Sequence, residues 1–154
     1  MDAVYQLKHD ADRVAAIQRA TLATKEFGIE PTHGLLGSRE WWSEIESGRL
    51  PVHRLRGMIG RVYMGNMNDW PGFELVTAEG QKSSWTREAN SKEQAARYVV
   101  GRSIEIDYVA QRHRPDSWDG GGEAKIVLFT LPVAVAQLLL APRRCDARII
   151  DLAP

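Results

Sequence analysis

The chain of 154 residues contains little that would assign it to a specialised class of protein. Its single cysteine, Cys145, cannot form an intramolecular disulfide, which is typical of a reducing compartment. The 20 basic and 20 acidic residues cancel, and this excludes the wrapping of nucleic acid by bulk charge. The longest uncharged stretch, residues 126–142, contains Pro132 and is shorter than the ~20 residues of a membrane-spanning helix. We therefore expect a cytoplasmic protein that has no membrane partner.

Spacings that identify a metal site or a reaction are also missing from the sequence. The four histidines are scattered, with no two within five residues of one another, so they do not form a ligand set. There is no Gly-x-Ser-x-Gly motif, and the glycines at 120–122 are followed by Glu-Ala-Lys, unlike a phosphate-binding loop. We expect no metal and no cofactor. The lack of catalytic spacing favours a non-catalytic protein over an enzyme.

What the sequence does contain is a change from helical to β patterning near Pro51. Residues 3–27 have no Pro or Gly and are rich in helix formers, and Gly28 ends this predicted helix. Ser38 is a suitable N-cap for a second helix at 39–47. After Pro51 the pattern predicts five strands, at 52–64, 73–78, 81–87, 103–109 and 125–131, with one helix at 91–98.

The predicted order after the two helices, β-β-β-α-β-β, resembles that of an OB-type barrel. Gly57 and Gly60 lie inside the first predicted strand, where glycines indicate a bulge or strong coiling. We therefore predict an α+β fold built on a small, curled antiparallel β-barrel. One compact domain would comprise a helical segment packed on the barrel, the barrel itself and a C-terminal helical or irregular tail, at residues 1–50, 51–131 and 132–154. An SH3-like barrel and an open α+β sheet are alternatives that the pattern leaves open.

The predicted strand at 103–109 alternates between apolar and acidic side chains. Ile104 and Ile106 fall on one face, while Glu105 and Asp107 fall on the other, which predicts a buried face and a solvent face. The buried face should join a core that also contains Tyr108, Val127, Phe129, Phe73 and Leu75. The two acids are close enough on one strand to form an acid–base pair, and pairing with arginines of a neighbouring strand is the alternative.

Charge is distributed unevenly along the neutral chain. Residues 49–114 contain 11 Lys and Arg against 7 Asp and Glu, a local excess of +4, and nine of the eleven are arginine. Arginine favours bidentate and stacking contacts, and arginine with aromatics is typical of a surface for single-stranded nucleic acid. The residues predicted to bind nucleic acid or a protein partner are Arg54, Arg56, Arg61, Trp70, Trp85 and Arg87.

Three functions fit these observations. The first is a non-catalytic binding module that contacts single-stranded nucleic acid or a protein partner through the Arg/Trp face. The second is a small enzyme with a cleft that uses Glu105, Asp107 or His113. The third is a self-associating structural protein, a homo-oligomer whose interface includes the uncharged segment. The adjacent Trp41 and Trp42 are predicted to clamp the helical segment onto the barrel or, if one is exposed, to mark an interface.

Overall fold

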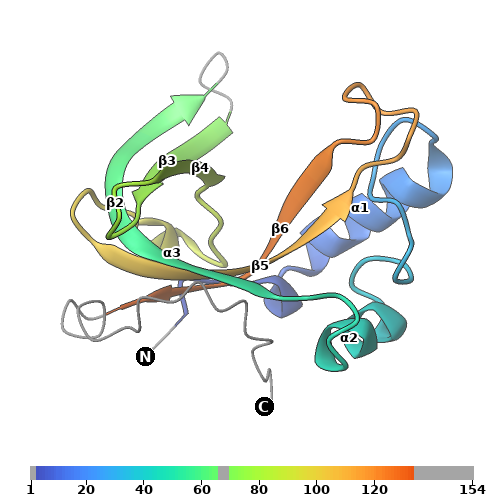
Figure 1. Cartoon of the computed structure of the whole chain (residues 1–154), viewed down its shortest axis with the longest axis horizontal. Coiled ribbons are helices and arrows are strands. Elements are labelled where there is room, and N and C mark those ends of the chain that lie inside the picture. Colours follow the sequence, from blue (N-terminus) through green and yellow to red (C-terminus); the bar gives the residue numbers. More distant parts are fainter. Residues whose placement is uncertain (1–2, 66–69, 134–154) are drawn as a thin grey trace. The chain divides into compact units, whose positions relative to one another are not determined.

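A computed structural model describes residues 3–65 and 70–133 of the chain (Figure 1). The strands are β1 (Tyr5–Gln6), β2 (His53–Gly65), β3 (Trp70–Val76), β4 (Lys82–Thr86), β5 (Ser103–Arg112) and β6 (Glu123–Pro132). The helices are a 3₁₀ turn (Leu7–His9), α1 (Ala11–Ala23), α2 (Arg39–Glu46) and α3 (Lys92–Ala95). These elements confirm the predicted α+β class, with an antiparallel sheet of six strands.

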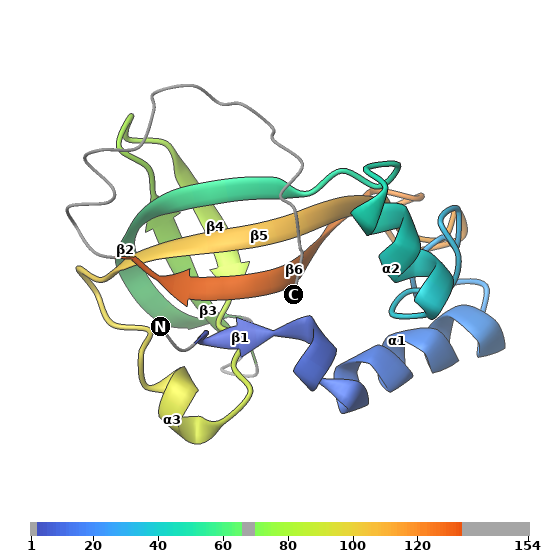
Figure 2. The same ribbon diagram turned by 90° about the horizontal axis from the view of Figure 1, so that it is seen from below.

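The strands are hydrogen-bonded in the order β1-β6-β5-β2-β3-β4, so β1 and β4 are the two edges of the sheet (Figure 2). Within the described part of the chain the sheet is not closed, and a barrel is therefore not confirmed. The edge strand β1 is only two residues long and offers little backbone for a closing strand. A side chain covers it instead. The amide of Asn90 accepts from the N–H of Gln6 at 2.7 Å and donates to the Gln6 carbonyl at 3.1 Å.

The described residues divide into two compact units, each of which combines separate parts of the chain. The sheet unit contains residues 3–6, Arg54–Asp107 and 129–133, and with them β3, β4, α3 and most of β2. The helix unit contains Leu7–His53 and Tyr108–Leu128, and with them α1, α2 and the loop between β5 and β6. Strands β5 and β6 contribute residues to both units.

The predicted division of the chain into 1–50, 51–131 and 132–154 is not tested by these units and stays a prediction. Most of the predicted C-terminal tail lies outside the described residues, as does Cys145. Within residues 3–65 and 70–133, no helix has the length and apolar character needed to cross a bilayer.

Local capping explains the two N-terminal helices. Ser38 precedes α2 as predicted, and its hydroxyl accepts from a first-turn backbone N–H at 3.2 Å. Gly48 follows that helix with a φ of +80°, a left-handed conformation that favours glycine. Helix α1 begins later than predicted, because Asp10 caps it by accepting from the N–H of Arg13 at 3.2 Å. The preceding Tyr5–Gln6 pairs with β6 instead of continuing the helix.

The glycines inside β2 have the role that the sequence predicted. Pairing of β2 with β3 shifts between Ile59 and Arg61, which is a bulge at Gly60. A Cβ on Gly57 would lie 2.5 Å from the carbonyl oxygen of Val76, so the two strands approach too closely there for a side chain. Gly57 and Gly60 therefore allow β2 to bend against β3.

The three strands β2, β3 and β4 share one face that packs in the core and an opposite face that carries exposed side chains. The register places Phe73 opposite Trp85, and these residues are 1% and 7% exposed. Tyr63, Gly72 and Thr86 are opposed in the same way, one residue along each strand, and therefore lie on the other face. This second face carries the exposed side chains described below.

Strand β5 is buried on both faces, which its alternation did not predict. Ile104 and Ile106 are each 1% exposed, as expected, but Glu105 and Asp107 are only 6% and 4% exposed. The expectation that the two acids face solvent is wrong, because their carboxylates are paired with arginine side chains of the neighbouring strand β2. Of the other predicted core residues, Phe73, Leu75 and Val127 are buried, and Tyr108 and Phe129 are half-buried.

Candidate partner-binding surface

Two of the predicted arginines, Arg54 and Arg56 of β2, contact the two acids of β5. Arg54 Nε donates to Asp107 Oδ1 at 2.9 Å and its Nη2 donates to Oδ2 at 3.2 Å, which makes a bidentate pair. The same Nε lies 2.8 Å from Oε1 of Glu105, and Arg56 Nε donates to Oε2 of Glu105. We call these four side chains the ion-pair cluster.

Burial and pairing act in opposite directions within the ion-pair cluster. Burial raises the pKa of Asp107, and the hydrogen bond and charge of Arg54 only partly offset that effect. The same hydrogen bond raises the pKa of Arg54. The arginine side chains are 36% and 33% exposed, whereas both acids are buried. The acids therefore have a structural role, and only the outer parts of the two guanidinium groups can reach a partner.

Trp85 and Arg87 of the predicted face make contacts inside the sheet unit. Trp85 is 7% exposed, and its Nε1 donates to Ser83 Oγ at 2.8 Å. Arg87 Nη2 donates to the carbonyl oxygen of Tyr63 at 3.0 Å, which links the end of β4 to β2 across β3. Trp85 thus packs in the core, and Arg87 fixes the backbone at Tyr63.

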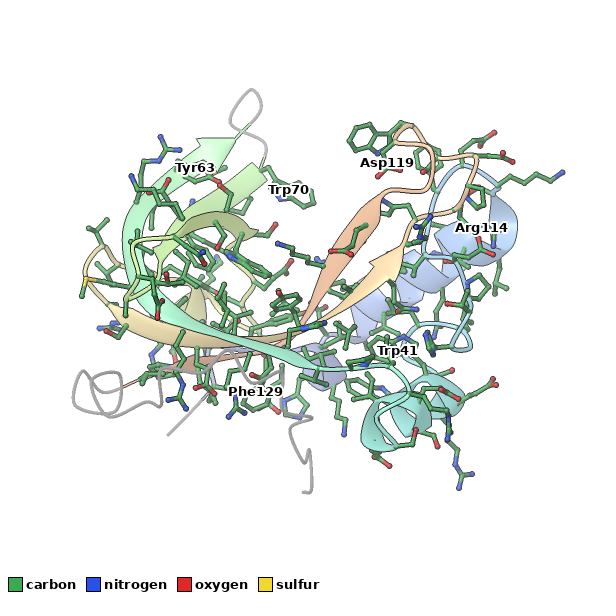
Figure 3. All side chains as sticks on the ribbon, viewed as in Figure 1. Trp41, Tyr63, Trp70, Arg114, Asp119 and Phe129 are labelled. Atoms are coloured by element: carbon green, nitrogen blue, oxygen red, sulfur yellow. The ribbon has the colours of Figure 1, made fainter. Side chains whose placement is uncertain are left out.

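Arg61, Tyr63 and Trp70 lie on one face of β2 and β3, where Arg61 and Trp70 are exposed and Tyr63 is half-buried, and we call them the aromatic patch. Figure 3 shows Tyr63 and Trp70 near the same end of these two strands. The guanidinium carbon of Arg61 lies 4.6 Å from the centre of the Tyr63 ring. A Cβ on Gly72 would lie 2.6 Å from that ring, so the ring rests on glycine backbone. Trp70 is 56% exposed, and its Nε1 donates to Thr86 Oγ1 at 2.8 Å, which fixes the indole at the surface.

Tyr63 is the residue of the aromatic patch that the sequence did not single out. The two-residue period of a strand places it on the face of Arg61, and that was the only available signal. The sequence alone does not show that Tyr63 and Trp70 are neighbours on adjacent strands. The register brings them together, because Tyr63 is opposite Gly72 and Trp70 is opposite Gly65.

His113, the third residue suggested for an enzyme cleft, orders the loop between β5 and β6 in the helix unit. Its Nδ1 lies 2.7 Å from Oδ2 of Asp119, and Asp119 Oδ1 accepts from the N–H of Gly122 at 3.1 Å. Hydrogen bonds from Ser117 first, and then from His113 and Gly122, hold the pKa of Asp119 below its ordinary value. Among the described residues, no three or more His, Cys, Asp or Glu side chains are arranged to hold a metal.

The helix unit also contains the adjacent tryptophans. Trp41 is fully buried, and its Nε1 donates to Gln111 Oε1 at 2.8 Å. Trp42 packs edge-to-face against it with ring centres 4.8 Å apart, and Lys8 Nζ lies 4.7 Å from the Trp42 ring. The pair therefore anchors α2 within its own unit.

Three large apolar side chains of the helix unit are exposed to solvent. Leu22, Phe27 and Trp118 have exposed fractions of 75%, 61% and 89%. Their segments are connected where Ile29 forms a backbone bridge with His113. Trp118 makes no side-chain hydrogen bond within the described part of the chain, whereas the indole of the aromatic patch is fixed by one.

Comparison with protein families gives one result for the chain as a whole. The family model described as Immunity protein RhsI2 matches residues 1–136. A search of the curated proteins found no match. The matched range contains every described residue and hence both units.

This match overturns the functions predicted from the sequence. A module for single-stranded nucleic acid and a small enzyme are both wrong, because the role of the family is that of an immunity protein. The same role replaces that of a self-associating structural protein. The arginines that suggested phosphate contacts, Arg54 and Arg56, are already bonded to carboxylates of the same sheet. Glu105 and Asp107 are correspondingly unavailable as an acid–base pair. A protein partner, the other part of the first prediction, agrees with the match.

Proposed function

The chain belongs to the RhsI2 immunity protein family, and from this we propose that it binds an Rhs toxin and neutralises it. The observation that carries the proposal is the family match over residues 1–136. Neutralisation by binding requires a stable, complementary surface and no chemistry of its own. The contacts of Glu105, Asp107 and His113, which are structural, support such a role.

We propose the aromatic patch as the part of the surface that meets the toxin. Trp, Tyr and Arg are the residues most enriched among those that dominate binding energy at protein interfaces. Arg61, Tyr63 and Trp70 supply one of each, on one face of the sheet unit. Their fixed positions support tight binding, because a side chain that is already ordered loses less entropy when a partner binds. Arg54 and Arg56 precede them on β2 with partly exposed guanidinium groups.

Two further features belong to this proposal. We propose that the toxin is met in the cytoplasm, since a single cysteine suits a reducing compartment.

We also propose that the sheet curls as an incomplete OB-like barrel, in which the Asn90 amide takes the hydrogen-bonding place of a closing strand at β1. Its paired hydrogen bonds with Gln6 support this, because they follow the pattern of a backbone ladder.

Direct binding and protection of cells test the proposed function. The purified chain should form a complex with the purified toxin domain of the cognate Rhs protein, measured by calorimetry and by size-exclusion chromatography. Co-expression of the chain should restore growth to cells that produce this toxin domain. A toxin of an unrelated family serves as the control and should neither bind nor be neutralised. The absence of both a complex and protection with the cognate toxin would overturn the proposal.

A further inference from the structure

The two edges of the sheet are treated differently. At β1, the side-chain amide of Asn90 forms hydrogen bonds with both the N–H and the carbonyl of Gln6. At β4, the strand order ends, and no described residue pairs with the outer side of the strand. Natural proteins usually protect such an edge with a proline, a bulge, a charged side chain such as lysine, or a covering segment. The one charged residue of β4, Lys82, stands at its first position. Strand β4 has no proline, and its register with β3 is continuous from Lys82 to Thr86.

The hydrogen bonds of the hairpin show which backbone groups of β4 are open. The N–H of Arg87 donates to the carbonyl oxygen of Pro71 at 3.1 Å, so the backbone at position 87 faces β3. Because this orientation alternates along a strand, positions 83 and 85 also face β3. The N–H groups of Lys82, Ser84 and Thr86 point outward, together with the carbonyls of Lys82 and Ser84. The Thr86 carbonyl accepts from a backbone N–H two residues on, at 2.9 Å, and is not open.

We propose that an extended segment of the Rhs toxin adds to the sheet as a strand beside β4. This inference rests on the proposed function and names how the toxin is recognised. An added strand would form hydrogen bonds with the outward backbone groups of Lys82, Ser84 and Thr86. Main-chain hydrogen bonds of this kind give the affinity when a peptide adds to an open sheet edge. Its side chains would alternate between the two faces of the sheet.

The side chains at the open edge define the chemistry of the segment. Lys82, Ser84 and Thr86 lie on the face that carries the aromatic patch. At one end, the exposed indole of Trp70 is bonded to Thr86 and offers an apolar contact. At the other end, Lys82 is exposed and makes no ion pair with a described residue, so it complements an acidic side chain. We therefore expect apolar and acidic toxin residues four positions apart, about 13 Å along the strand.

Residue-resolved hydrogen exchange of the free protein and of its complex with the toxin domain tests this inference. In the free protein, the amides of Ser83 and Trp85 should be protected by β3, and those of Ser84 and Thr86 should exchange fast. Toxin binding should slow exchange at Ser84 and Thr86.

A complex in which both amides still exchange fast overturns strand addition but leaves the proposed function standing. Failure to form any complex overturns the proposed function as well. Protection that grows with protein concentration without toxin, together with a dimer mass, assigns the edge to a second copy and overturns the toxin assignment.

A pair of substitutions at one position provides the matched test. Ser84→Pro removes an outward N–H that β3 does not use, whereas Ser84→Ala keeps the backbone and removes only an exposed hydroxyl. Ser84→Pro should weaken toxin binding about tenfold or more, and Ser84→Ala, which keeps the outward N–H, should weaken it much less than Ser84→Pro does. Equal affinity of a folded Ser84→Pro variant would overturn the inference. If this variant does not fold, the exchange experiment on the wild-type protein decides.

Discussion

Arg54, Arg56 and Arg61 lie on one strand, yet their guanidinium groups have different partners. The first two are bonded to buried acids of β5, and the third rests on a tyrosine ring at the surface. Residue type and spacing do not distinguish these environments. The partners come from a strand about 50 positions away, and only the strand order decides that β5 lies beside β2. At the scale of the residue, the sequence therefore does not show which arginine has a carboxylate partner and which one is free to contact another protein.

Removal of Arg54 should destabilise the protein far more than removal of Arg61. Arg54→Ala leaves Asp107 buried without its bidentate partner, which should lower the free energy of unfolding by about 2–4 kcal/mol, somewhat less than for a fully buried pair. Arg61→Ala removes an exposed contact of the same residue type from the same strand and should cost less than about 1 kcal/mol. Urea denaturation of both variants measures the difference. Equal midpoints would contradict the structural role of the ion-pair cluster.

The defect of Arg54→Ala should depend on pH. Burial raises the pKa of Asp107 above 3.8 in the folded protein despite Arg54, so the folded state keeps this proton to a higher pH than the unfolded chain. Stability therefore falls as the pH rises from the unfolded pKa through the folded one. Without Arg54 the folded pKa is higher still, and the carboxylate costs more at neutral pH. The gap between variant and wild type should narrow as the pH falls from about 7 to about 4. Urea midpoints at several pH values measure it, and a constant gap would contradict the argument.

At the scale of the element, the covered edge at β1 gives a separate prediction. Asn90→Ala removes both hydrogen bonds to the backbone of Gln6, whereas Asn90→Asp can keep only the one that it accepts. Because these bonds are exposed, the alanine variant should lose about 1 kcal/mol of stability. Exchange of the Gln6 amide should be fastest in Asn90→Ala, intermediate in Asn90→Asp and slowest in the wild type. Unchanged exchange in Asn90→Ala would show that the side chain does not protect this edge.

Elements governed by local rules were predictable from the sequence, and elements governed by distant contacts were not. Helix α2 follows from Ser38 and Gly48, which satisfy the ends of the helix by themselves. The hairpin of β3 and β4 follows from its turn and its alternation. Strand β1 has two residues and no periodicity to detect, and its pairing depends on β6 at the other end of the chain.

The alternation of β5 illustrates the limit of a pattern. It separates Ile104 and Ile106 from Glu105 and Asp107 correctly. A period of two shows that the faces differ, but it does not show whether each face is covered. Both faces of β5 are buried: Ile104 and Ile106 on one face, and Glu105 and Asp107, which are paired with arginines of β2, on the other. The aromatic patch was likewise visible only in part, because Arg61 and Trp70 could be chosen by residue type whereas Tyr63 required the register.

At the scale of the whole molecule, family membership is a property that no single segment carries. The match extends over residues 1–136, across the helices and the sheet alike. The arginine-rich segment predicts a nucleic-acid surface only if its guanidinium groups face outward, and Arg54 and Arg56 are instead paired with acids of β5. The family match and the ion-pair cluster together correct that prediction, since they leave a protein partner and a smaller exposed surface.

Two exposed tryptophans, one in each unit, allow the proposed toxin surface to be located. Trp70 belongs to the aromatic patch of the sheet unit, and Trp118 lies in the loop of the helix unit. Trp70→Ala should weaken toxin binding by about 2 kcal/mol, or about 30-fold, and reduce protection of cells, because a fixed indole at an interface is typical of a hot spot. Trp118→Ala should leave both unchanged. Calorimetry and growth assays measure these effects, and thermal melts check that both variants stay folded. Loss of binding in Trp118→Ala with retention in Trp70→Ala would place the surface in the helix unit and contradict the proposal.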